Sequence, residues 1–340
     1  MNGRQRTLAA LRGEQPNRVP VMLHNFMMAA RQAGYTMGEY RRNPEAIARS
    51  FIQAVETYEY DSVVVDIDTA TLAGALGVPV ELPEDGPAAC RAPAIATLDQ
   101  VRDLPPPDLA RNQRVRIWLE ATRRLQRYFG DEVLVRGNCD QSAFSLAALV
   151  RSIPEFLVDI MEPDRAGLVH LLLEHTLAAA TQFIALMAET GAPLVSNGNS
   201  TAGPDMVSPS VYRRIAQPYD RRVAEFAHRL GLPWILHICG KTDRILEDML
   251  ATGADGLDLD YKTDMTLARH TLAGRAAFIG NLDPSAVLAR GTPELVARKT
   301  RELLQTFDGE PRFILNAGCA MPASTPPENL RAMIRASREA

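Results

Sequence analysis

Short runs of apolar and β-branched residues recur along the chain, and each is followed by a segment with the apolar periodicity of a helix. Runs of this length, rich in valine, isoleucine and leucine, are typical of strands buried on both faces. We predict eight strands, at Val19–His24, Asp61–Asp66, Val133–Asn138, Pro193–Asn197, Trp234–Ile238, Gly256–Leu259, Ala277–Gly280 and Arg312–Asn316.

The segments between these strands have helical periodicity and helix start and stop signals. Asn43 precedes Pro44 and Thr292 precedes Pro293, which combines a capping residue with proline in the first turn. Gly253 stands where a helix is expected to end. The predicted helices are Pro44–Tyr58, Val115–Phe129, Asp164–Thr190, Ser208–Leu230, Lys241–Thr252, Met265–Leu272, Pro293–Phe307 and Pro327–Arg338.

Strands that alternate with helices predict an α/β protein with a parallel sheet. Eight such units favour a closed (β/α)8 TIM barrel, because open sheets more often have about five or six strands; an open doubly wound sheet is the alternative. We expect residues 1–340 to form a single barrel domain. The proline-rich stretch at about 71–113 has few core residues, so we interpret it as an insertion or lid after the second strand.

Composition narrows the class of protein. The formal net charge of −4 provides no basic surface, so we expect no nucleic-acid partner. No apolar run approaches the roughly 20 residues of a membrane span, and the first residues do not resemble a secretory signal. The four cysteines are too sparse for a disulfide framework, which favours a cytoplasmic protein whose cysteines bind metal or react.

Two strand ends carry metal-binding residue types. His237 and Cys239 lie two residues apart in the fifth strand and therefore point to the same side of it. Cys319 follows the eighth strand, and the carboxyl ends of barrel strands meet at one face, where catalytic groups lie. One imidazole and two thiolates suit Zn²⁺, and three protein ligands leave one tetrahedral position open, as in catalytic zinc sites.

Other interpretations of these residues stay open. A free cysteine is often only a small buried apolar residue, and Cys139 after the third strand is a possible substitute ligand. Zinc with thiolate ligands is suited to holding a substrate thiol as its thiolate, a nucleophile toward a methyl donor. Zinc hydroxide hydrolysis is the competing chemistry, although the chain has no His-Glu-x-x-His motif.

The chain resembles a known family in its second half. The H-x-C-G motif at His237–Gly240, together with Gly256–Asp258, Gly280–Pro284, Gly318–Pro322 and Thr325–Leu330, resembles the uroporphyrinogen decarboxylase superfamily. Within it, the zinc pattern H-x-C plus a distant C is similar to that of the corrinoid-dependent methyltransferase branch. The resemblance extends over nearly the whole chain and is most specific in its last third.

The resemblance implies a zinc-dependent methyltransferase. Its reaction would move a methyl group between a corrinoid and a thiol such as coenzyme M, or another small donor or acceptor such as a methoxylated compound, in a direction left open. The resemblance places Zn²⁺ on His237, Cys239 and Cys319. No cobalamin-binding domain follows the predicted barrel, so we expect the corrinoid in trans, from a separate corrinoid protein or as free methylcobalamin.

Two alternatives accompany this hypothesis. A decarboxylase of this family has two arginines in the motif R-Q-A-G-R, whereas this chain has Arg31 followed by Tyr35 in place of the second arginine. Such an enzyme also uses an aspartate after the second strand, for which Asp66 or Asp68 would serve, but it has no use for the zinc pattern. A non-enzymatic barrel that only binds a corrinoid partner is the other alternative.

Further polar residues near strand ends are tentative substrate-binding candidates. Each could bind a ligand or orient a metal ligand, or equally cap a turn. The candidates are His24, Asn138, Asp140, Asn197, Asn199 and Asp258.

Overall fold

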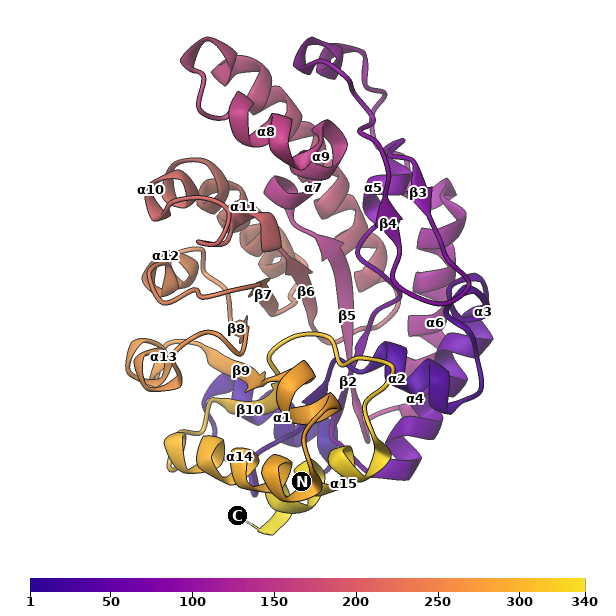
Figure 1. Cartoon of the computed structure of the whole chain (residues 1–340), viewed down its shortest axis with the longest axis vertical. Coiled ribbons are helices and arrows are strands. Elements are labelled where there is room, and N and C mark those ends of the chain that lie inside the picture. The colour runs from indigo at the N-terminus through magenta and orange to yellow at the C-terminus, as the bar shows by residue number, and fades with distance from the viewer. Residues whose placement is uncertain (340) are drawn as a thin grey trace.

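The barrel is closed and parallel in the computed structural model, which describes residues 1–339 (Figure 1). Its eight strands follow one another round the sheet in chain order, and a bridge between Val21 and Leu315 joins the last strand to the first. The prediction of a (β/α)8 barrel is therefore confirmed. The strands are β1 (Met22–Leu23), β2 (Ser62–Val65), β5 (Leu134–Gln141), β6 (Val195–Gly198), β7 (Trp234–Ile238), β8 (Gly256–Leu259), β9 (Ala277–Leu282) and β10 (Phe313–Ala317).

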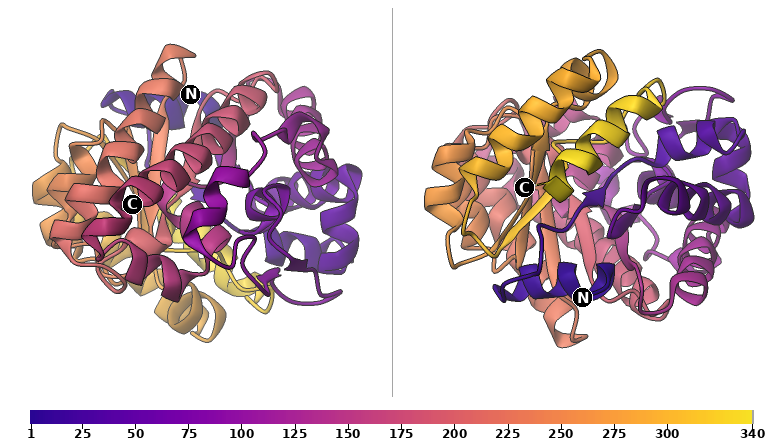
Figure 2. Two further views of the ribbon diagram at one scale, coloured as in Figure 1. Left: turned by 90° about the horizontal axis from the view of Figure 1, so that it is seen from above. Right: turned by 90° about the horizontal axis from the view of Figure 1, so that it is seen from below.

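Helices surround the barrel, and the last two, α14 and α15, pack side by side (Figure 2). The longer helices present their apolar faces to the strands, as their periodicity predicts. Those that follow strands are α4 (Pro44–Tyr58), α6 (Gln113–Phe129), α9 (Ala166–Ala188), α11 (Gln217–Arg229), α12 (Leu246–Leu250), α13 (Met265–Leu272), α14 (Pro293–Thr306) and α15 (Pro327–Glu339).

Two predicted helices differ from the structure. The segment Ser208–Leu230 is divided into α10 (Pro209–Val211), a π-helical turn and α11, because Pro218 cannot donate a backbone hydrogen bond to the preceding turn. Of Lys241–Thr252, only α12 is helical. Thr242 Oγ1 lies 2.8 Å from Thr263 Oγ1, and this contact holds the chain after β7 out of the helix.

Several short elements were not predicted from the sequence. Helix α7 is apolar on all sides and almost wholly buried, so it has no amphipathic pattern to detect. These elements are α1 (Gly3–Arg12), α2 (Phe26–Gln32), α3 (Met37–Arg42), α7 (Ala143–Arg151), α8 (Ile153–Asp159) and the small turns between them.

The proline-rich stretch contains a short helix α5 (Thr71–Ala75) and a hairpin of β3 (Val80–Glu81) and β4 (Ala89–Cys90). Helix α3 anchors it, since the Arg41 guanidinium donates to the carbonyls of Pro83 and Gly86, at 3.0 and 2.5 Å. The hairpin is thereby held over the carboxyl ends of the barrel strands, where Pro87 and Ala88 line a cavity.

Helix α1 contacts four strands of the barrel and supplies part of its interior core. Ala10 and Leu11 of α1 pack against one buried apolar layer built from seven of the eight strands or the residues that precede them. The strand residues of this layer are Met22, Val64, Leu134, Leu194, Ile235, Ala277, Ile279 and Ile314. The lower end of the barrel is therefore filled with apolar side chains.

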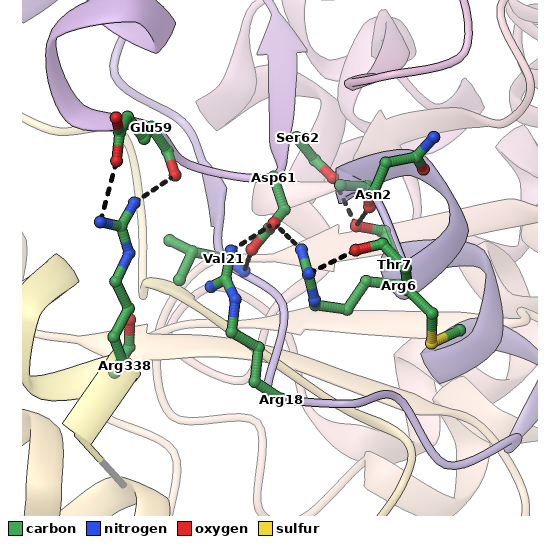
Figure 3. A network of polar contacts seen from close by, with 12 residues as sticks. Asn2, Arg6, Thr7, Arg18, Val21, Glu59, Asp61, Ser62 and Arg338 are labelled. Carbon is green, nitrogen blue, oxygen red and sulfur yellow. Dashed lines mark hydrogen bonds and ion pairs between the residues drawn. The ribbon is translucent and has the colours of Figure 1, made fainter.

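A charged network fixes α1 to the barrel (Figure 3). Asp61, immediately before β2, is buried and accepts hydrogen bonds from Arg6 of α1, from Arg18 at 2.9 Å and from the Val21 amide at 2.9 Å. The Thr7 and Ser62 hydroxyls are 2.6 Å apart beside it. One carboxylate thus joins α1 to β2 and to the chain that enters β1.

One helical stretch, Pro163–Ala188, is long and apolar enough to cross a membrane by length and composition. His170, Glu174 and His175 interrupt it, so it is not a continuous apolar run in the sequence. Half of its most apolar window is buried, and α9 packs against α7, α11 and β5, as the core helix of a barrel does.

Replacing Asp61 with asparagine should destabilise the protein by about 3–5 kcal/mol, because two arginines would lose their buried charge partner. Urea unfolding followed by circular dichroism measures the change. Asp131→Asn is the matched control, since Asp131 pairs with Arg4 on the surface and its side chain is 86% exposed. Equal stabilities of the two variants would contradict the role assigned to Asp61.

Candidate metal centre

Strand β7 delivers the first two candidate ligands. His237 and Cys239 are two residues apart at its carboxyl end, and both side chains face the same cavity. The backbone of Gly240 has a φ of 89°, and a Cβ there would lie 2.5 Å from the Asp205 carboxylate. Glycine is therefore required for the chain to turn away immediately after Cys239.

The third candidate ligand follows β10. Cys319 lies two residues beyond Ala317, the last residue of the strand. A Cβ on the intervening Gly318 would lie 2.3 Å from the backbone nitrogen of Tyr261, so this position has no room for any side chain. Close packing against the chain after β8 therefore sets where Cys319 stands.

The predicted ligands meet in the structure. His237, Cys239 and Cys319 each offer a ligand atom, and these atoms lie within 4.8 Å of one another. Ligand atoms bound tetrahedrally to zinc at 2.0–2.3 Å would be separated by roughly 3.3–3.8 Å, so the cluster fits the ion with small adjustments. Cys139 lies outside the cluster; it is fully buried, 3.7 Å from the Gly137 carbonyl.

Hydrogen bonds orient the histidine. Nδ1 of His237 lies 2.7 Å from the backbone carbonyl of Asp258 on the neighbouring strand β8, so Nδ1 carries the proton and donates. Nε2 points at Cys239 Sγ, 3.1 Å away, and is the nitrogen whose lone pair a metal would take in exchange for a proton. The Nδ1 hydrogen bond thus fixes the ring in the orientation that a ligand bound through Nε2 needs.

The two thiols differ in acidity. The hydrogen bond from Cys319, the neighbouring His237 and the Ser200 hydroxyl, 3.1 Å from Cys239 Sγ, lower the pKa of Cys239 to about 3. The hydrogen bond to Cys239 and burial raise the pKa of Cys319. Burial lowers the pKa of His237, but the charge of Cys239 outweighs it and raises this pKa to about 10. The cluster thus already holds one thiolate, the form that binds metal.

A cavity opens above the cluster at the carboxyl ends of the strands. It encloses about 910 Å³ including its open mouth, a size suited to a small ligand. Apolar side chains form one part of its wall, among them Phe26, Met27 and Val64. Of the six tentative candidates, His24, Asn138, Asp140, Asn197 and Asp258 line this cavity.

Asn199 does not line the cavity. Its side-chain oxygen Oδ1 accepts hydrogen bonds from the amide and the hydroxyl of Ser145, and its side-chain nitrogen Nδ2 donates to both carboxylate oxygens of Asp220 at 2.9 Å. It lies one residue beyond the end of β6, so the alternation that places Asn197 inward does not extend to it. Asn197 itself binds the Cys139 carbonyl and the Trp234 indole.

A buried ion pair forms the floor of the cavity, and sequence reasoning missed its cation. Arg136 of β5 donates to the Asp258 carboxylate at 2.6 Å and to the Ser196 hydroxyl at 2.8 Å. Its signal in the sequence is a charged residue directly after the apolar run Val133–Val135 of the predicted strand. Because Asp258 also holds His237 through its carbonyl, the ion pair and the candidate metal site share one residue.

A group of carboxylates forms another part of the wall. Asp66, Asp68 and Asp140 all line the cavity and are buried. Burial, and then the charge of Asp68, raise the pKa of Asp140 well above its usual value. Arg114 pairs with Asp68, which compensates part of the negative charge.

The barrel carries its cluster of candidate metal ligands and its cavity at the carboxyl ends of the strands, where the active sites of barrel enzymes lie. The model of the uroporphyrinogen decarboxylase (URO-D) family matches residues 2–340, so the chain belongs to this family. A methylcobamide:CoM methyltransferase MtaA of Methanosarcina barkeri is 26% identical over 98% of this chain and 97% of its own. A uroporphyrinogen decarboxylase of Thermus thermophilus is 30% identical over 98% of this chain and 97% of its own.

A solved structure has the same fold. A methyltransferase from Methanosarcina mazei superposes with a TM-score of 0.91 and 23% identity, covering 100% of this chain and 99% of its own. Methyltransferases and decarboxylases thus stand at comparable distances among the relatives, and the residues of the site must distinguish the two activities.

The purified protein should contain about one zinc ion per chain, as expected for a single three-ligand site. Replacing His237, Cys239 or Cys319 with alanine should each remove most of the metal, because two ligands bind far more weakly than three. Metal analysis of the purified variants measures this. Cys139→Ala is the matched control, and its zinc content should equal that of the wild type; full zinc in Cys319→Ala would exclude that residue as a ligand.

Proposed function

We propose that the chain, an enzyme of the methyltransferase class, moves a methyl group between a corrinoid and a small thiol held at a zinc ion. The observation that carries this proposal is the meeting of His237, Cys239 and Cys319 at the rim of a cavity. Three ligands of this type would leave a tetrahedral metal with one position for a substrate atom. Zinc, when bound, supplies a Lewis acid that stabilises the deprotonated sulfur of a thiol.

The residues of the site each have a task in this reaction. His237 and the two cysteines would hold the metal at one side of the cavity, and the Asp258 carbonyl fixes the imidazole. The Ser200 hydroxyl donates to Cys239 and moderates the charge of that thiolate. Phe26, Met27 and Val64 exclude water from the reacting sulfur, which strengthens a charged nucleophile toward a methyl group.

The placement of Arg31 counts against a decarboxylase. Arg31 corresponds to the first arginine of the R-Q-A-G-R motif, but it is exposed on α2 and does not line the cavity. Tyr35 stands in place of the second arginine. A substrate with several carboxylates would find Arg41 and Arg136 in the cavity, and both are already paired with aspartates or carbonyls.

We further propose that the 71–113 stretch acts as a lid within a single barrel domain. Pro87 and Ala88 of its hairpin form part of the cavity wall, so movement of the hairpin would widen the mouth. A corrin is flat and broad, and its methyl group must align with the sulfur for direct displacement. The relatives that act on methylcobamides favour a corrinoid presented from outside, on a partner protein or free in the cytoplasm.

Zinc should be needed for activity more than for folding. The barrel core is built from apolar side chains on all eight strands and does not depend on the cluster. Removing zinc with a chelator should therefore abolish methyl transfer while the unfolding transition in urea shifts only modestly. Re-addition of zinc to the same sample should restore activity, and outright unfolding of the chelated protein at about 25 °C would make the site structural.

The protein should consume methylcobalamin in the presence of a suitable thiol. Loss of the methylcobalt absorbance follows the reaction, and coenzyme M is the first thiol to test because the MtaA relative is a methylcobamide:CoM methyltransferase. X-ray absorption at the zinc edge should show one added sulfur ligand when the thiol binds. Cys239→Ala should lose both signals.

Two results would change the proposal. Turnover with a thiol that adds no sulfur to the zinc shell would refute the thiol-binding role of the metal. Reaction of a methoxylated compound with cob(I)alamin, without any thiol reaction, would keep the metal site and reverse the direction of transfer.

A further inference from the structure

His24 and the buried Asp66 form a pair on the cavity wall that the proposed reaction does not yet use. His24 follows β1 and Asp66 follows the neighbouring strand β2, and Nε2 of the imidazole lies 2.7 Å from Oδ2 of the carboxylate. The Asp66 side chain is 2% exposed, and its other oxygen, Oδ1, has no hydrogen-bond partner within residues 1–339.

Barrel closure places this pair beside the candidate metal ligands. The His24 carbonyl accepts a hydrogen bond of 2.9 Å from the amide of Met321, two residues beyond Cys319. The His24 amide in turn lies 3.3 Å from the Asn316 side chain, just before the end of β10. His24 and Cys319 therefore come from adjacent strands of the barrel, and both line the same cavity.

The carboxylate determines which ring nitrogen of His24 is basic. A carboxylate only accepts hydrogen bonds, so Nε2 carries the proton and donates to Asp66. Nδ1 then holds the free lone pair, and within residues 1–339 no side chain or backbone group hydrogen-bonds to it. The ring stacks on Phe26 at 5.5 Å and is 20% exposed, so it is held in one orientation at the cavity surface.

We propose that His24 Nδ1 accepts the proton of the substrate thiol, with Asp66 as the positioning residue that fixes its tautomer. The inference rests on the proposed function and adds the base that it lacks. The S–H bond breaks, the proton binds to Nδ1, and the electron pair stays on sulfur. Sulfur then forms a bond to the methyl carbon, the carbon–cobalt bond breaks, and its electron pair stays with the cobalt of the corrinoid. Water takes the proton from His24 after the thioether leaves.

The Asp66 carboxylate keeps Nε2 protonated and holds the ring in place, so Nδ1 is the nitrogen free to take a proton. His24 is also the only histidine besides His237 among the residues that line the cavity. The buried acids nearby are poorer acceptors: Arg114 pairs with Asp68, Arg136 pairs with Asp258, and the raised pKa of Asp140 favours its protonated form.

Kinetics of three variants test the role. His24→Asn should lower kcat/KM for the thiol about 100-fold. Asp66→Asn keeps the shape of the pair but favours the wrong tautomer, so it should cause a loss of the same order. His228→Asn is the matched control. His228 and Asp255, the residue before β8, form a second histidine–aspartate pair at 2.8 Å, and neither residue lines the cavity. Replacing His228 should therefore leave kcat/KM unchanged.

A proton count separates this role from a structural one. Calorimetry of thiol binding to the zinc-loaded protein, in two buffers of different ionisation enthalpy at about pH 8, gives the protons released per thiol. Wild type and His228→Asn should release fewer protons than His24→Asn and Asp66→Asn, by up to about one, because His24 retains the proton. Metal analysis and circular dichroism check that each variant contains zinc and is folded. If His24→Asn fails either check, the same measurements on His24→Gln and Asp66→Asn test the role.

The outcomes distinguish this inference from the proposed function. Equal proton release by all four proteins, with or without a loss of rate in His24→Asn, would overturn the role of His24 while thiol binding to zinc stands. A wild-type protein that binds no thiol at zinc would overturn both.

Discussion

Closure of the barrel between β1 and β10 is the constraint on which the site depends. His237 lies on β7 and Cys319 directly follows β10, and these strands are three steps apart in the sheet. In a flat sheet, three strand spacings would separate them by roughly 14 Å. The curvature of a closed barrel instead brings the ligand atoms within 4.8 Å of one another. The Val21–Leu315 bridge and the hydrogen bond from Leu315 to the Pro20 carbonyl, at 2.9 Å, complete this closure even though β1 has only two residues.

The interior of the barrel is divided into an apolar lower half and a polar upper half. Arg136 and Asp258 stand at the boundary, where each charge is compensated by the other and by Ser196. A buried pair of this kind contributes little net stability, but removal of either member would leave an uncompensated charge. Asp258 therefore has two structural tasks, since its carboxylate neutralises Arg136 and its carbonyl orients the imidazole of His237.

The sequence allowed prediction of the barrel and of the three candidate ligands because both depend on local periodicity and on the shared direction of parallel strands. β7 and β8 have the predicted bounds, and His237 and Cys239 face one way as alternation requires. The pairing of Arg136 with Asp258 and of His24 with Asp66 could not be predicted, because each joins residues far apart in sequence through strand register. Helix α7 was not predicted because nearly all of its residues are buried and it has no polar face. The prediction that Asn199 lines the site failed because β6 ends at Gly198, so the alternation of the strand does not extend to it.

Helix α1 and the apolar layer above it close the lower end of the barrel, so a small molecule reaches the candidate metal ligands from the rim alone. A corrin lying across that rim would cover the entrance. In the proposed reaction the thiol would therefore have to bind before the corrinoid docks on the rim. The methylated product could leave only after the corrinoid had dissociated. Helix α1 and the apolar layer, which lie at the end of the barrel opposite the cavity, would thus impose an ordered sequence of binding and release on the proposed reaction.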